Sequence, residues 1–290
     1  MKHIALAGFI CAGLAACQTP SIAQNAAPAA AEEAPEWRTV APENLLLINT
    51  RHGQTVIELN PAFAPKHVAQ FRTLATANVY DGEAFYRVID GFVAQGGIED
   101  EDIIALHPTL ENENDRALSS AGFVALGNGD LFTEEVGHID GFPVGRSAEL
   151  GREWLLHCPG ALAMARDEDP DSGGTEFYIV LDAQRYLDRN LTVFGRVIDG
   201  MQYIQKLKRG DRAIESGVIQ APDKGDTITS MQIASDRPEA DRPSYRVMTT
   251  SSAAFEAAKT SKRVRAEAFF YRTPPEVLDI CGFEPPVEKD

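Results

Sequence analysis

The stretch Phe85–Gly97, FYRVIDGFVAQGG, places one arginine, Arg87, and one glutamine, Gln95, in an apolar run that ends on two glycines. If the run alternates as a strand, Phe85, Arg87 and Ile89 share one face. An arginine among apolar neighbours needs a partner or a water-filled cleft, because an unpaired buried cation is costly. The stretch therefore indicates either an active site or an edge strand with its arginine in solvent.

Other catalytic chemistries have little support in the chain. Ser172 lies in DSGGT, not in the strained G-x-S-x-G turn of a hydrolase. The acidic run Glu99–Asp102 lacks the alternating oxygens and central glycine of a calcium loop, and we expect a solvated loop there. No helical i, i+3 or i, i+4 metal pair occurs among the histidines His3, His52, His67, His107, His138 and His157. We expect no metal and no cofactor.

Four motifs follow one another along the chain: FYRVIDGFVAQGG, GALAMAR, GGTEFYIVL and YLDRNLTVFGRVIDGM. In order and in approximate spacing they resemble the cyclophilin-type peptidyl-prolyl isomerases. The resemblance covers about Asn44–Ala234, with an enlarged middle at Ile103–Pro159, and does not cover the tail. One such motif would be weak evidence, whereas four in order are strong. The resemblance implies a mainly β fold, a closed antiparallel eight-stranded barrel capped by two helices.

The resemblance also assigns roles to residues. Arg87 matches the catalytic arginine, and Gln95 matches the glutamine that helps to bind the substrate backbone. The other matched positions contact the peptide: Phe92, Tyr178 and Leu187 line the proline pocket, Val93 replaces the usual Met, Ala165 lies beside the groove, and Tyr186 stands where many members have Trp.

The chemistry of the prolyl bond explains these residue types. Rotation about an X–Pro bond is opposed by amide resonance, with a barrier of roughly 18–20 kcal/mol. A guanidinium that hydrogen-bonds to the prolyl nitrogen in the twisted state localises its lone pair and stabilises the transition state more than the ground state. An apolar pocket holds the proline ring, and a glutamine fixes the adjoining carbonyl.

Three positions depart from the family pattern. Tyr86 stands where many members have His, and Leu191 occupies a position often held by a pocket histidine. Glu176 replaces the usual Gln, and we hypothesise that its carboxylate pairs with Arg87. Such a pair would lower basal activity or adapt the groove to cationic peptides.

The surrounding elements are read from periodicity and turn signals. We expect a hairpin over Asn44–Asn60, helices near Pro65–Ala77 and Met201–Arg209, and a closing strand at Asp226–Ala234. Ile103–His157 is Gly-rich and aromatic-rich, which is more typical of long ordered loops than of strands. In the tail we expect a helix over Ser251–Lys262 and a strand over Arg265–Tyr271. Periodicity alone predicts a mainly β domain, either barrel or sandwich.

Composition restricts the partners. Hydrophobic residues make up 44% and charged residues 24% of the 290, as in a globule with a sizeable core. The net charge of −16 disfavours nucleic acid and anionic membrane surfaces, and SKRVR at Ser261–Arg265 is the longest basic cluster. We expect a monomer that binds proline-containing polypeptides and contacts the membrane only through a lipid anchor.

The N-terminus resembles an export signal. Lys2 and His3 precede an apolar run, Ile4–Ala16, that is too short to span a bilayer. LAAC, which ends at Cys17, resembles the bacterial lipobox, in which the cysteine is lipidated, and Gln18 after it suggests the outer membrane. The alternative is cleavage after Ser21–Ala23. Either way we expect the mature protein in the periplasm.

Cysteine usage agrees with export. Removal of the signal deletes Cys11, and lipidation would use Cys17. Cys158 and Cys281 then remain in an oxidising compartment, where two leftover thiols more often pair than stay free. Two separate buried thiols are the alternative.

The chain thus divides into four predicted parts: a signal with lipobox at 1–17, a flexible Ala/Pro-rich tether at 18–43, a cyclophilin-like domain at 44–234 with an enlarged loop at 103–159, and a C-terminal extension at 235–290. We expect a peptidyl-prolyl isomerase that assists folding of exported proteins. Glu176 and Leu191 favour an alternative, a weak or inactive module that binds proline-containing envelope proteins. A purely structural lipoprotein would require a blocked groove.

Overall fold

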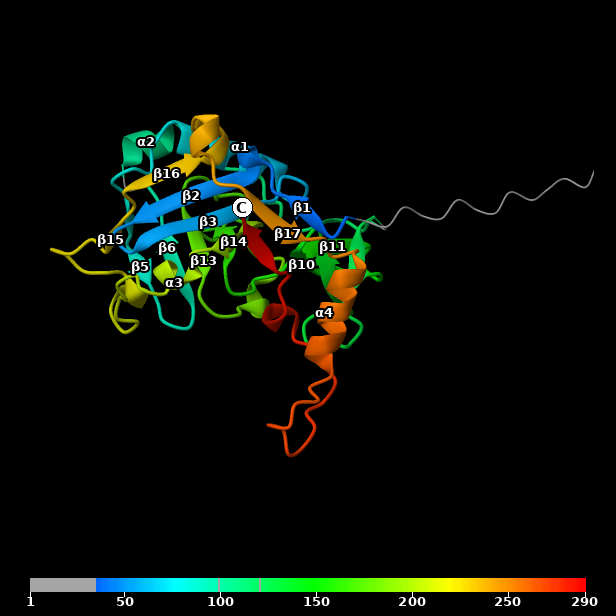
Figure 1. Cartoon of the computed structure of the whole chain (residues 1–290). Helices are drawn as coiled ribbons and strands as arrows, with labels where there is room; N and C mark the ends of the chain where they lie inside the picture. Colours follow the sequence, from blue (N-terminus) through cyan, green and yellow to red (C-terminus); the bar gives the residue numbers. More distant parts are fainter. Residues whose placement is uncertain (1–34, 99, 120) are drawn as a thin grey trace, which may run out of the picture. The chain divides into compact units, whose positions relative to one another are not determined.

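The computed structural model describes residues 35–98, 100–119 and 121–290. The predicted signal, Cys17 with its lipobox, and the tether up to residue 34 lie outside these residues. The main sheet has eight antiparallel strands in the order β16-β2-β3-β14-β12-β13-β6-β5 (Figure 1). Their bounds are β2 Leu45–Thr50, β3 Gly53–Leu59, β5 Arg87–Val88, β6 Val93–Gly96, β12 Ala161–Met164, β13 Phe177–Val180, β14 Val193–Asp199 and β16 Ser230–Ile233.

The prediction of a mainly β fold with eight antiparallel strands is confirmed, and the sheet curls as a half-barrel. Its two edge strands, β16 and β5, do not pair with each other within the described chain. The segments that precede them pair instead, as β4 Ala84–Phe85 and β15 Asp226–Thr227. The expected closing strand at 226–234 is therefore two short strands, β15 and β16. The main sheet does not close into the expected barrel, because its edge strands β16 and β5 are not paired with each other in the part of the chain that the structure describes.

One aromatic core fills the concave side of the sheet. Helix α1, Pro65–Thr76, buries Val68, Phe71 and Leu74 at helical spacing, and Pro65 begins it as expected because its missing N–H is unneeded there. The Phe71 ring lies 5.4 Å from Phe177 and 4.8 Å from Phe194, centroid to centroid. The helix predicted at Met201–Arg209 is shorter: α3 spans Met201–Ile204 and continues as turns.

The acidic run at 99–102 was expected to be a loop, but part of it is helical. Helix α2 spans Glu101–Ala105. Its N-cap is Asp100, whose side chain accepts hydrogen bonds from the backbone N–H groups of Asp102 and Ile103. The acidic side chains lie in the first turn, where the helix dipole favours them.

The prediction of long loops at 103–157 is wrong for much of this segment, because strands between residues 116 and 155 form a second antiparallel sheet. Its order is β7-β11-β10-β9-β8, with bounds β7 Arg116–Ala117, β8 Phe123–Ala125, β9 Glu135–Ile139, β10 Phe142–Ser147 and β11 Arg152–Leu155. The β9–β10 turn is Asp140–Gly141, with φ of 48° and 86°. A two-residue Asp-Gly turn with both φ positive suits a hairpin, so these two residues are a local signal for a hairpin at this point of the sequence.

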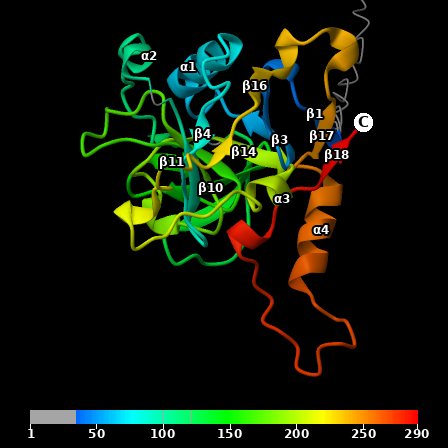
Figure 2. The ribbon, with the colours of Figure 1, turned by 90° about the vertical axis from the view of Figure 1, so that its left-hand side faces the viewer.

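The C-terminal extension adds a third sheet and a helix (Figure 2). The sheet has the order β1-β17-β18, with β1 Trp37–Thr39, β17 Tyr245–Met248 and β18 Val287–Lys289. Residues 37–39 were assigned to the tether, but they pair with β17. The remaining helical turns are η1 Pro42–Asn44, η2 Arg185–Leu187, η3 Glu215–Gly217, η4 Ala234–Asp236, η5 Glu239–Asp241 and η6 Ile280–Gly282.

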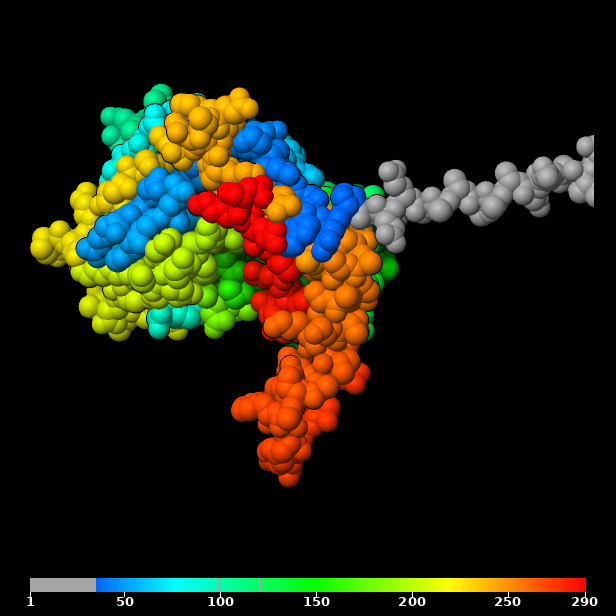
Figure 3. Space-filling view, viewed as in Figure 1, coloured from blue at the N-terminus to red at the C-terminus, as the bar shows by residue number. Residues whose placement is uncertain are grey.

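The tail helix is present, whereas the tail strand is not. Helix α4 spans Ala253–Arg263, and the Ser252 hydroxyl caps it by accepting from the N–H of Phe255 at 3.2 Å. The strand expected at Arg265–Tyr271 is replaced by turns. Phe269 and Tyr271 are 86% and 89% exposed, on a segment that extends away from the sheets (Figure 3). Without a neighbouring strand, β-propensity alone does not form a ladder.

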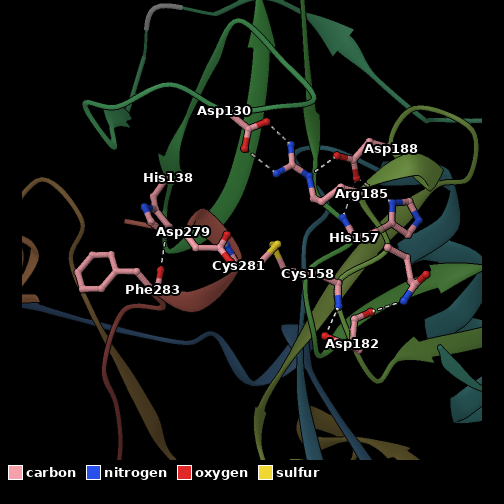
Figure 4. The surroundings of a disulfide bond; sticks show 12 residues. Asp130, His138, His157, Cys158, Asp182, Arg185, Asp188, Asp279, Cys281 and Phe283 are labelled. Carbon is pink, nitrogen blue, oxygen red and sulfur yellow. Dashed lines mark hydrogen bonds and ion pairs between the residues drawn. A yellow bond between two sulfur atoms is a disulfide. The ribbon is translucent and has the colours of Figure 1, made fainter. Parts of the chain in front are cut away.

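A disulfide joins the second sheet's region to the C-terminal extension (Figure 4). It links Cys158 and Cys281, whose Cα atoms lie 4.9 Å apart across 123 residues of sequence. Around it, Trp154 and Leu156 share a buried cluster with Phe255 of α4. Nearby, burial lowers the pKa of His138 to about 4, so its neutral ring donates from Nε2 to the Phe283 carbonyl at 3.1 Å.

Replacing this disulfide should destabilise the chain. Closure of so long a loop restricts the unfolded ensemble, so we expect Cys158→Ser/Cys281→Ser to lower the free energy of unfolding by about 2–4 kcal/mol. Urea titrations of both proteins measure the difference, and reducing agent should destabilise only the wild type. A mass spectrum of the non-reduced protein that shows two free thiols would contradict the link.

Candidate active site

The strand register puts the predicted catalytic residues in one row. Arg87 on β5 pairs with Gln95 on β6, and Gln95 pairs with Tyr178 on β13. Directly paired residues of antiparallel strands point to the same face of a sheet. Their neighbours Ala94 and Phe177 point to the other face and join the main core. Period-two alternation therefore gives the sheet a core face and a site face.

The opening motif is not one continuous strand, which corrects the expected alternation. Phe85 ends β4, where it pairs with Asp226, while Arg87 begins β5. The break at Tyr86 lets Phe85 point into the core although Arg87 lies on the site face. Phe85 and Arg87 therefore do not share a face. Strand β4 pairs with β15, whereas β5 pairs with β6. These pairings, and not the alternation of the sequence, decide which way each side chain points.

Arg87 is half-buried and has partners on two sides. Its Nε donates to the Ser216 carbonyl at 2.9 Å, and its Nη1 donates to Oε1 of Gln95 at 2.9 Å. Its guanidinium carbon lies 5.7 Å from the ring centroid of Phe92. The guanidinium is thus fixed on the site face of the sheet, beside an aromatic ring. No hydrogen bond from Nη2 to any described residue is present.

Gln95 connects Arg87 to Tyr86 and Glu176, two residues that depart from the family pattern. Its Nε2 donates to the Tyr86 hydroxyl at 2.6 Å and to Oε2 of Glu176 at 3.1 Å. The Tyr86 hydroxyl also donates to Oε2 of Glu176. Burial and the Glu176 charge raise the pKa of Tyr86, which keeps its proton on the oxygen. Glu176, which we expected to pair with Arg87, is therefore connected to it through Gln95.

The double glycine has a packing role. A Cβ on Gly97 would lie 2.5 Å from Oε1 of Glu176, and one on Gly96 would lie 2.9 Å from the Ala84 carbonyl oxygen. Both distances are shorter than real Cβ contacts. Glycine at position 97 therefore makes room for the Glu176 carboxylate beside the row of Arg87, Gln95 and Tyr178.

Five of the predicted substrate-binding residues gather in one cluster on the site face. Val93 and Tyr178 are buried in one cluster, against which Phe92, Ala165 and Leu191 pack. Leu187 and Tyr186 come from η2, and the Tyr186 ring is exposed. Leu191 adds an apolar surface where a histidine would have added a polar one. Beside this cluster a cavity of about 340 Å³ is lined by Gln95, Ala165 and Glu176.

Tyr178 is held in place by hydrogen-bonded residues that the sequence did not indicate. Its hydroxyl lies 2.9 Å from Nε2 of His157, and the two rings stack with an interplanar angle of 17°. Asp188 accepts from the His157 backbone N–H at 2.9 Å and from its Nδ1 at 3.1 Å. Arg185 bridges Asp188 to both carboxylate oxygens of Asp130 (Figure 4). Burial raises the pKa of Tyr178, so the hydroxyl stays protonated and donates to the ring.

This network fixes the position of the Tyr178 ring. Because Asp188 can only accept, Nδ1 of His157 carries a proton, while Nε2 makes the hydrogen bond with the Tyr178 hydroxyl. The signal in the sequence was the Tyr at position 178, whose hydroxyl requires a buried partner. Nothing in the spacing identified His157 as that partner. Among the described residues, no group of three His, Cys, Asp or Glu side chains is arranged to hold a metal ion.

Comparisons with known proteins agree with this geometry. Residues 45–233 match the family "Cyclophilin type peptidyl-prolyl cis-trans isomerase/CLD". A "Probable peptidyl-prolyl cis-trans isomerase" of Brucella suis biovar 1 (strain 1330) is 31% identical over 221 residues, which is 76% of this chain and 91% of the relative. "Peptidyl-prolyl cis-trans isomerase B" of Bacillus subtilis (strain 168) is 33% identical over 154 residues, 53% of this chain and 82% of that protein.

A solved structure is similar over most of the chain. The crystal structure of cyclophilin AquaCyp293 from Hirschia baltica superposes with a TM-score of 0.70 and 29% identity, and it covers 87% of this chain and 93% of its own. The match therefore extends beyond the main sheet. Together with the family match and the row of Arg87, Gln95 and Tyr178, it leads to one conclusion: this chain belongs to the cyclophilin-type peptidyl-prolyl cis-trans isomerase family.

Proposed function

We propose that the protein catalyses rotation about X–Pro peptide bonds in polypeptide substrates. The observation that carries the proposal is the state of Arg87, which is fixed by Gln95 and the Ser216 carbonyl while Nη2 has no protein partner in the described chain. Nη2 is therefore the donor available to a prolyl nitrogen. Two anchors on the guanidinium reduce the conformational entropy lost on binding, which favours pre-organised stabilisation of the twisted state.

The neighbouring side chains supply the remaining parts of the mechanism. Phe92, Val93 and Tyr178 offer an apolar surface for the proline ring. Gln95 Nε2 fixes the substrate carbonyl, for which it must exchange its contact with Glu176 or Tyr86. The carboxylate thus competes with the substrate for the same donor. This competition predicts catalysis that is slower than with the usual glutamine at position 176.

Arg87→Ala tests the reaction and its site together. Removing one donor to the developing lone pair should reduce kcat/KM by about 100-fold or more. The measurement is a protease-coupled isomerisation assay on an X–Pro peptide. Arg272→Ala is the matched control, because that arginine is exposed on the tail segment and should leave kcat/KM unchanged. Equal acceleration by wild type and Arg87→Ala would show that the site lies elsewhere.

Glu176→Gln tests the competition for Gln95. Removing the charge should free the Gln95 amide and raise kcat/KM on a neutral peptide by about three- to tenfold, since a hydrogen bond to a charged group is worth about 1.5–3 kcal/mol before exchange with solvent and substrate. The same variant should lose preference for peptides with lysine near the proline. The control is Glu168→Gln, an exposed acid. Unchanged catalysis together with unchanged peptide preference would end the hypothesis.

A second candidate function is supported by the same carboxylate. A module that binds proline-containing segments without turnover would use the groove while Glu176 keeps Gln95 engaged. The apolar Leu191 also suits binding of an apolar segment. Peptide binding without acceleration by the wild type would favour this function over catalysis.

We further infer that the protein acts on exported polypeptides as an outer-membrane lipoprotein. The lipobox-like LAAC that ends at Cys17 supports this, and so does the Cys158–Cys281 disulfide, which persists in oxidising compartments. Within the part of the chain that the structure describes, no helix has the length and apolar character to cross a membrane. The anchor that we propose is the lipid on Cys17, on the strength of the lipobox-like LAAC.

The anchor predicts a specific modification. In the native host the mature chain should begin at Cys17, carry acyl chains and fractionate with the outer membrane, because two or more chains are needed for stable anchoring. Mass spectrometry of the mature N-terminus checks this, with Cys17→Ala as the comparison, which should not be acylated. An unacylated N-terminus after Ala23 in the wild type would support simple cleavage instead.

A further inference from the structure

A second and larger cavity lies next to the proposed active site. It encloses about 700 Å³ between η2 with the residues that follow it and the β9–β11 part of the second sheet. The walls carry large apolar side chains that are left open to solvent: Phe132 is 56%, Leu150 52% and Tyr186 61% exposed. Large apolar groups around one concavity are typical of a binding surface rather than of ordinary surface variation. We name this cavity the flanking cavity.

The flanking cavity adjoins the predicted proline pocket through one short segment of the chain. Tyr186 lines it, and the next residue, Leu187, is a predicted proline-pocket residue. Asn190 also lines it, and the next residue, Leu191, packs on the proline-pocket cluster. One short segment, 186–191, therefore forms the boundary between the two. A polypeptide with its proline on one side of this segment has its neighbouring residues within reach of the other side.

The charge of the flanking cavity is negative once internal pairs are removed. Arg185 is neutralised by Asp130 and Asp188, the three residues drawn together in Figure 4. Arg189 pairs with Asp115 at 2.8 Å, and Asp115 also pairs with Arg152. The extra positive charge of this group offsets the extra carboxylate of the Arg185 group. Two lining acids remain, Glu134 and Glu149, and the described chain offers neither of them an ion-pair partner. A basic side chain would complement this rim.

The internal pairs also make the wall rigid. Arg185 reaches the loop of the second sheet through both oxygens of Asp130, and its guanidinium carbon lies 5.1 Å from the centroid of Phe132. Bidentate arginine–carboxylate pairs fix geometry as well as energy. The apolar walls are therefore held apart from each other before any ligand arrives, which reduces the entropic cost of binding.

We propose that the flanking cavity binds the part of the client polypeptide adjacent to the isomerised proline, and that it selects segments that combine an apolar side chain with lysine or arginine. The proposal rests on the proposed isomerase function and specifies its substrate class. Its occupant follows from the adjacency to the predicted proline pocket through residues 186–191 and from the charges of Glu134 and Glu149, for which the described chain holds no ion-pair partner.

The test compares short and extended peptides on the mature-length chain from Gln18. The short substrate is a tetrapeptide with one X–Pro bond, and the extended substrates add Lys-Leu-Lys-Leu before or after it. Four added residues reach about 13–14 Å further when extended. The variant is Leu150→Ser/Glu149→Lys, and the matched control is Val277→Ser/Glu276→Lys, an equally exposed pair on the tail segment. Thermal unfolding confirms that both variants fold.

For the wild type we expect kcat/KM to be about tenfold higher on one of the two extended peptides than on the tetrapeptide, through a lower KM, because remote contacts made equally in ground and transition states act on KM. The Leu150→Ser/Glu149→Lys variant should lose this gain and keep tetrapeptide turnover within twofold, whereas the control keeps both. If neither extension improves kcat/KM, or if the variant retains the gain, the proposal is overturned.

The outcome also separates this proposal from the isomerase function. Failure of the wild type to accelerate the tetrapeptide contradicts catalysis but not the cavity. Binding of a fluorescently labelled extended peptide is then titrated without turnover. Weaker binding to the double variant than to the control supports the cavity as a polypeptide site. Equal binding to both, or self-association of the chain that Leu150→Ser/Glu149→Lys abolishes while peptide binding is unchanged, overturns it.

Discussion

The site depends on how a charged guanidinium is satisfied in a half-buried position. Burial of an unpaired arginine is costly, yet a fully paired one has no donor left for a substrate. Here Arg87 gives Nε to a backbone carbonyl and Nη1 to Gln95, and Nη2 has no partner within the described chain. The pairing of β5 with β6 makes this possible, because it sets Arg87 directly opposite Gln95. The rest of the main sheet keeps that register in place.

Gln95 connects Arg87 to the residues that depart from the family pattern, Tyr86 and Glu176. Its carbonyl orients Arg87, and its amide contacts Tyr86 and Glu176. A glutamine at position 176 could offer both a donor and an acceptor, whereas the carboxylate only accepts. Both hydrogen bonds to Glu176 therefore run the same way, with Tyr86 and the Gln95 amide as donors and the carboxylate as acceptor. Gly97 is part of the same arrangement, because any Cβ there would displace the carboxylate.

The second sheet and the C-terminal extension support the site from the side of Tyr178. The second sheet is stabilised internally by Glu153, which is fully buried between Arg116 and Arg146. The Cys158–Cys281 disulfide and the cluster around Trp154 and Phe255 fasten it to the C-terminal extension. His157, next to the disulfide, contacts the Tyr178 hydroxyl. The predicted proline pocket and the flanking cavity are thus both bordered by residues that this network holds in place, from segments far apart in the sequence.

The sequence by itself determined the family, the main-sheet hairpin and helix α1, because ordered motifs and hydrophobic periodicity are local properties of a chain. It also singled out Arg87, Gln95 and Tyr178, which the strand register brings into one row. It did not determine which strand pairs with which. The second sheet consists mostly of strands that pair with their neighbours in the chain, so its Asp140–Gly141 turn was a usable local signal. In contrast, the break at Tyr86, β1 within the supposed tether and the His157–Tyr178 contact follow from partners that are not adjacent in the sequence. Only the tertiary structure could decide these, since a backbone hydrogen bond or a buried hydroxyl specifies that a partner must exist but not where along the chain it lies.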